Sequence, residues 1–72
     1  MSKDFQLIIG SPIDYEYLVV YIEVNGEDIG LVHMENGKDK MEFEFFKIEE
    51  KLSIDLNSLI EALIEAKKEL LK

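Results

Sequence analysis

The chain has 72 residues, of which 47% are hydrophobic and 33% charged, so it has room for one small globular domain. It contains no cysteine, which excludes disulfides, zinc sites built on cysteine, iron–sulfur clusters and thiol catalysis. A chain of this size buries only about 60% of its unfolded surface, so we expect a marginally stable monomer or a homodimer.

The net charge of the chain limits the classes of molecule that we expect it to bind. Sixteen acids against eight lysines give a net charge of −8, which repels nucleic acid and anionic membranes and favours basic proteins. Arginine does not occur, so the planar side chain that reads phosphate or guanine is missing, and direct nucleic-acid binding is not expected. Residues 1–5 lack a signal-peptide pattern, and no apolar run approaches the roughly 18 residues of a membrane span. We therefore expect a cytoplasmic protein without a membrane partner.

Two strands are expected in the first third of the chain. Residues 5–9 form a short run rich in β-branched and aromatic side chains, which ends at a glycine. Residues 17–24 are almost entirely β-prone, and this near-continuous apolarity predicts a central strand covered on both faces. Alternation assigns half of it to the face away from the expected helix: Tyr17, Val19, Tyr21 and Glu23. The Ser–Pro dipeptide between the strands is compatible with a helical turn over residues 11–15.

The middle of the chain carries two strong hairpin signals: Asn25–Gly26 and Asn36–Gly37. They delimit a third strand, expected over about residues 28–34. A fourth strand over residues 41–45 alternates apolar and acidic side chains. Its apolar residues are predicted to face the core, and its acids Glu42 and Glu44 to face water or a partner.

The end of the chain predicts a helix. After a polar connection over residues 47–53, apolar residues recur three and four positions apart from residue 55 to residue 71, with Asp55 as the N-cap. Four of them are assigned to the core: Leu56, Leu59, Ile60 and Leu63. If Ile64 and Leu71 stay exposed, a dimer that pairs its helices is favoured.

These elements predict one α+β domain over residues 1–72. Its architecture is a four-stranded antiparallel meander, in the order 1-2-3-4, with one C-terminal helix packed on one face (ββββα). One helix covers one face, so the second face of the sheet must be solvated, paired with another subunit, or used for binding.

The excess negative charge falls on the sheet. Residues 14–50 contain eleven acids and three lysines, which is the whole net charge of −8. Acids and tyrosines would share the second face, and we predict a partner-binding site there: Tyr17, Tyr21, Glu23, Glu42 and Glu44. The alternative is an ordinary solvated surface, since glutamates that alternate with apolar residues usually mark the wet side of a strand.

No motif predicts a reaction, metal or cofactor. His33 is the one histidine and has no second histidine or cysteine with which to bind a transition metal. Ser11 lacks the surroundings of a catalytic serine, and a turn or cap explains it better. The abundant carboxylates would need a partly dry pocket for acid–base work, which a chain this small rarely builds. We therefore predict a protein that is not an enzyme.

Parts of the sequence also resemble other proteins. The segment Ile8-Ile9-Gly10-Ser11-Pro12-Ile13-Asp14-Tyr15-Glu16, the Asn25–Gly26 hairpin and the Glu/Ala/Lys/Leu-rich terminal helix resemble a group of short, acidic, uncharacterised bacterial proteins. That resemblance implies no activity. In size and charge the chain is also similar in kind to small immunity proteins and phage-encoded inhibitors.

The function expected from the sequence is that of a non-enzymatic inhibitor, immunity or anti-defence protein. Its acidic sheet face would dock onto a basic surface of a nuclease, toxin or other nucleic-acid-acting protein, as a nucleic-acid mimic does. The alternative is a small homodimeric structural or regulatory subunit, in which the charge serves only solubility.

Overall fold

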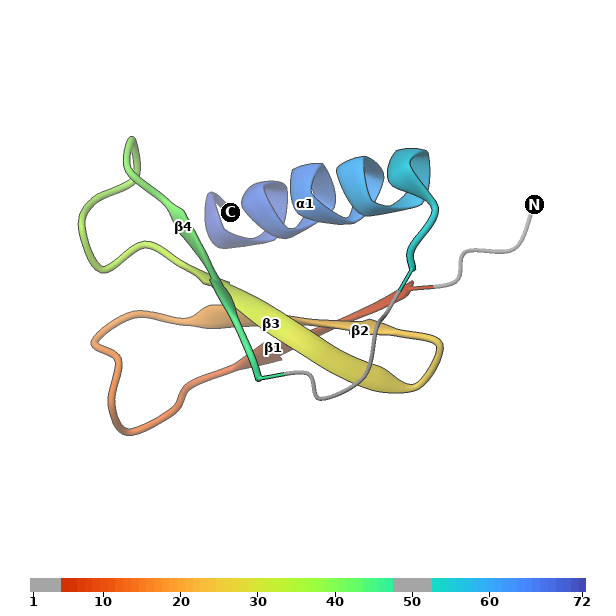
Figure 1. The fold of residues 1–72 in the computed structure, drawn as a ribbon. Helices are drawn as coiled ribbons and strands as arrows, with labels where there is room; N and C mark the ends of the chain where they lie inside the picture. The colour runs from red at the N-terminus through yellow and green to blue at the C-terminus, as the bar shows by residue number, and fades with distance from the viewer. Residues whose placement is uncertain (1–4, 48–52) are drawn as a thin grey trace.

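The computed structural model describes residues 5–47 and 53–72, which form a four-stranded antiparallel sheet with one helix across one face (Figure 1). The elements are β1 (Phe5–Gly10), β2 (Val19–Val24), β3 (Glu27–His33), β4 (Glu42–Phe45) and α1 (Leu56–Leu70). The strand order is β1-β2-β3-β4. The predicted ββββα meander of the α+β class is therefore confirmed.

The β2–β3 hairpin forms as its turn residues predict. Asn25 and Gly26 have φ angles of 52° and 83°, and a type I′ turn requires positive φ at both of its central residues. The second signal, at Asn36, opens a longer loop in which Gly37 takes a φ of 112°. The Gly37 N–H there donates to the Met34 carbonyl oxygen at 3.0 Å.

The main core lies between the sheet and α1. β2 and β3 supply most of its buried side chains, and α1 adds small ones: Val20, Ile22, Val24, Ile29, Val32, Ala62, Ala66 and Leu70. Figure 1 shows α1 lying across the sheet, where its backbone comes close to β1, β2 and β3, while the Phe43 side chain of β4 packs against the edge of the same core. The helix therefore lies mainly over three strands, and β4 reaches the core through Phe43.

The face that the helix presents to the sheet agrees only in part with the prediction, because Leu59 and Leu63 pack against the core as expected but Leu56 and Ile60 do not. Asp55 is the N-cap as expected, and its carboxylate accepts from the Ser58 N–H at 3.0 Å. The assignment of Leu56 and Ile60 to the core is wrong, because they are 67% and 45% exposed, whereas Ala62 is fully buried. The buried face runs through the alanines because short side chains let the helix backbone approach the sheet closely.

The β1–β2 connection also differs from the prediction. In place of a helical turn over residues 11–15, the Tyr15 N–H donates to the Pro12 carbonyl oxygen at 3.2 Å and closes a single turn. β2 begins only at Val19, so Tyr17 precedes the strand instead of belonging to it. Most of the expected polar connection, residues 48–52, lies outside the described residues.

Candidate functional site

The second face of the sheet, opposite α1, is partly covered by the chain itself. Val20 and Ile22 pack toward α1, so Val19, Tyr21 and Glu23 face the other way. Val19 is nevertheless fully buried, and Leu31, which pairs with Tyr21, is only 3% exposed. The prediction that β2 is covered on both faces therefore holds, and the second face is not a bare surface.

Aromatic rings provide this cover. The Tyr15 ring, from the β1–β2 loop, lies 5.5 Å from the His33 ring between centroids, and its hydroxyl donates to Glu44 Oε1 at 2.7 Å. The Tyr21 ring lies 6.3 Å from that of Phe46. A second, smaller apolar layer therefore sits on the second face, with the loop folded over it.

His33 belongs to this layer. It is 8% exposed, its Nδ1 accepts the Glu35 N–H at 3.3 Å, and its Nε2 lies 3.5 Å from Glu42 Oε1. Because Nδ1 accepts, the neutral ring carries its proton on Nε2, facing the Glu42 carboxylate. The arrangement positions the end of β3 against β4 and explains the histidine as a structural residue.

Glu35 fixes the β1–β2 loop. Its two carboxylate oxygens accept the N–H groups of Glu16 and Tyr17, each at 3.0 Å. These two backbone hydrogen bonds lower the pKa of Glu35 below its usual value, because they stabilise the ionised carboxylate. The Tyr17 ring, about half exposed, is thus presented from an anchored backbone.

Negative charge is concentrated on the second face. The strands carry five acids and no lysine: Glu23, Glu27, Asp28, Glu42 and Glu44. Glu27 pairs with Val24 and therefore lies on the helix side. The other four lie on the second face, where Glu23 pairs with Asp28 and Glu42 pairs with His33. The lysines of the described residues lie in the β3–β4 loop, at Lys47 and near the end of α1. This face therefore has an acidic strip with apolar rings beside it.

The structure brings four of the five predicted site residues onto one face: Tyr21, Glu23, Glu42 and Glu44. The placement of Tyr17 in the same strand is wrong, because it belongs to the loop. Sequence reasoning missed Tyr15 and Glu35. Their roles depend on contacts with Glu44 and with the loop backbone, 18 to 29 residues away along the chain, and no local pattern signals them.

The Tyr15–Glu44 contact predicts an alkaline titration. The hydrogen bond to the Glu44 carboxylate raises the pKa of Tyr15 from 10.0 to about 12. Since the folded value exceeds the unfolded one, the contact stabilises the fold below pH 10.0, and this contribution is lost as the pH rises toward 12. In Glu44→Gln, we expect the pKa of Tyr15 to fall back toward 10.0, measured by tyrosinate absorbance. Tyr15→Phe identifies the late-titrating phenol, and identical titrations of wild type and Glu44→Gln would contradict the assignment.

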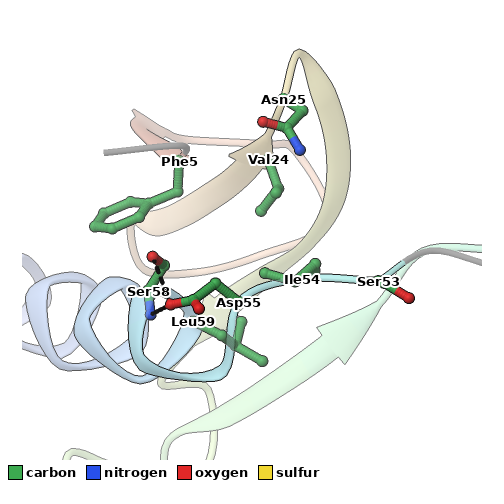
Figure 2. Close-up of a pocket in the computed structure, with 8 residues that line it drawn as sticks. All are labelled: Phe5, Val24, Asn25, Ser53, Ile54, Asp55, Ser58 and Leu59. Carbon is green, nitrogen blue, oxygen red and sulfur yellow. Dashed lines mark hydrogen bonds between the residues drawn. The ribbon is translucent and has the colours of Figure 1, made fainter. Parts of the chain in front are cut away.

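A separate small pocket of about 150 Å³ lies between the start of α1 and the end of β2, next to the β2–β3 turn (Figure 2). Its lining is half polar and half apolar: Asn25, Ser53, Asp55 and Ser58 beside Phe5, Val24, Ile54 and Leu59. The Asp55 carboxylate at its edge accepts from both the N–H and the hydroxyl of Ser58. That carboxylate therefore serves to cap the helix.

The chain matches no protein-family model, no curated protein and no solved structure. Within residues 5–47 and 53–72, no helix combines the length and apolar character needed to cross a membrane. The same ranges hold no group of three His, Cys, Asp or Glu side chains placed to bind a metal ion.

Proposed function

We propose that this chain is a small acidic protein-binding module that blocks a basic surface of a nucleic-acid-acting protein. The observation that carries the proposal is the charge distribution over the sheet, where the four strands contribute four acids and no lysine to the face opposite α1. Such a face attracts the lysine- and arginine-rich groove of a nuclease or toxin, and repels nucleic acid itself.

In the proposed mechanism, the acidic side chains speed association and the tyrosine rings slow release. The carboxylates of Glu23, Glu42 and Glu44 would take positions that phosphates occupy in the partner's groove, which speeds association by long-range attraction. Tyr21 offers a large, stiff contact area on the same face as these acids, and Tyr17 adds an exposed ring from the β1–β2 loop, near Met34 and Lys38. Their desolvation on binding would slow release. The hydrogen bond from the Tyr17 N–H to the Glu35 carboxylate holds the backbone of Tyr17 in place before the partner arrives, which reduces the conformational entropy lost on binding.

The test begins with the native protein as bait for its partner and continues with kinetics on the recovered complex. We expect the recovered partner to be basic, its association rate to fall at least about tenfold from low to high ionic strength, and duplex DNA to compete with binding. An association rate independent of salt, or a partner that binds this chain and DNA together, would overturn the proposal.

Two variants with the same change of net charge locate the binding face. Glu42→Lys reverses a charge on the second face, and Glu27→Lys reverses one on the helix side of the same sheet. We expect the first to slow association about tenfold and the second to leave it within about twofold. Equal losses in both variants would show that net charge, and not this face, governs the encounter.

A further inference from the structure

Four large apolar residues remain exposed along one flank of α1 and at its C-cap, and we call them the helix strip: Leu56, Ile60, Ile64 and Leu71. At about 100° per residue they fall within an arc of about 80°, with Lys67 between them. The buried face of α1, through Ala62 and Ala66, lies outside this arc. None of the four therefore belongs to the core cluster of one chain.

The strip ends in a hollow. Lys67 and Leu71 line a pocket of about 530 Å³ together with Lys38, Asp39 and Met41 of the β3–β4 loop. Figure 1 shows the C-terminal end of α1 close to this loop. An apolar side chain placed above Leu71 by a second molecule would find room there.

Charge along α1 changes sign between its two halves. The first half, with its cap, carries two acids and no lysine: Asp55 and Glu61. The second half, with the residues that follow it, carries three lysines and two acids: Lys67, Lys68 and Lys72, with Glu65 and Glu69, and Lys72 Nζ lies 2.9 Å from Glu69 Oε2. Two such helices side by side in parallel place like charges together. In antiparallel pairing, each acidic half meets the half in which lysines outnumber acids. The helix is thus complementary to a second copy of itself in one orientation.

We propose that the helix strip is a homodimer interface in which α1 pairs antiparallel with α1 of a second copy, about a two-fold axis near Ile64. Residues whose numbers sum to about 127 then face each other. Leu56 of one copy meets Leu71 of the other at the hollow, and Glu61 meets Lys67, whose aliphatic stem covers Ile60. Every contact occurs twice, as an isologous interface requires.

This dimer leaves the second face of each sheet pointing away from the interface. It is independent of the proposed function, since it uses the opposite side of the molecule. If both hold, one dimer presents two acidic faces and binds two partner molecules, whereas dimerisation through Tyr17 and Tyr21 would block that binding.

Sedimentation equilibrium over a concentration series tests the interface. We expect wild type to be a dimer that Ile64→Glu dissociates, raising the dissociation constant at least about 30-fold. Ile13→Glu is the matched control, because Ile13 is 101% exposed in the β1–β2 loop, and it should leave the dimer unchanged. Circular dichroism of the variants checks that the fold persists. A wild type that stays monomeric at millimolar concentration, or an unaffected dimer in Ile64→Glu, would overturn the proposal.

A charge exchange tests the antiparallel orientation. Glu61→Lys and Lys67→Glu should each weaken their own homodimer about tenfold, because each creates two like-charge contacts. An equimolar mixture of the two variants should recover a heterodimer of about wild-type affinity, since its contacts pair opposite charges again. If the mixture binds no better than the separate variants, the antiparallel arrangement is wrong.

Discussion

Replacing Gly30 with alanine is expected to lower the free energy of unfolding by about 1–3 kcal/mol and to loosen β4 from the sheet. A Cβ at this position would collide with the Glu44 carbonyl oxygen and would lie 2.7 Å from the Phe43 ring. The first obstacle is backbone, so rotating a side chain cannot relieve the clash. Either β4 moves or the β3 backbone bends.

Gly10→Ala is the matched control for this prediction. Its Cβ would lie 2.7 Å from the edge of the Tyr21 ring, and a ring edge can shift where a backbone oxygen cannot. We expect Gly10→Ala to cost less than Gly30→Ala in urea denaturation. Hydrogen exchange should report faster opening of the β4 amides in Gly30→Ala alone. Equal destabilisation by the two variants would show that Gly30 is not a close-contact position.

Gly30 lies beside a feature that the sequence signals only weakly. The β2–β3 register shifts between Ile22 and Glu23, so Ile29 is an extra residue on β3, and it is buried. A lone glycine inside a strand suggests a bulge or a close contact. Here Gly30 lies next to the bulge at Ile29 and itself makes the close contact with β4. Which strand approaches that glycine depends on the sheet order, which is a tertiary property.

The elements and their order could be predicted because the signals that define them are local. The Asn25–Gly26 turn sets one hairpin, alternation defines β4, and Asp55 caps α1. Short connections between antiparallel strands then leave a meander as the simplest arrangement. Each of these signals lies within a few residues of the element that it defines.

What could not be predicted depends on distant contacts. The apolar arc of α1 is wider than one sheet face needs, so periodicity alone did not decide between Ile60 and Ala62 as the buried residue. The β1–β2 loop likewise takes its shape from Glu35 and Glu44, which lie far along the chain. Alternation correctly placed the acids of the candidate site, but the start of β2, and with it the position of Tyr17, was set by that loop.

The buried alanines of α1 provide the sharpest test of how the helix sits. In Ala62→Leu, we expect the free energy of unfolding to fall by about 1–3 kcal/mol, because Ala62 is fully buried against the sheet and the larger side chain would push α1 outward. The amphipathic pattern alone suggests the opposite, since leucine is more apolar and remains a good helix former.

Asn57→Leu introduces the same side chain at an exposed position of the same helix. It should change the free energy of unfolding by less than about 0.5 kcal/mol, because no packed neighbour must move. Urea denaturation of both variants, at a protein concentration low enough to keep the chains monomeric, separates packing from dimerisation. An Ala62→Leu protein as stable as wild type would mean that α1 lies farther from the sheet. In that case, the small size of the alanines would not determine how α1 is rotated on the sheet. It would therefore not determine which flank of the helix stays exposed for a second molecule.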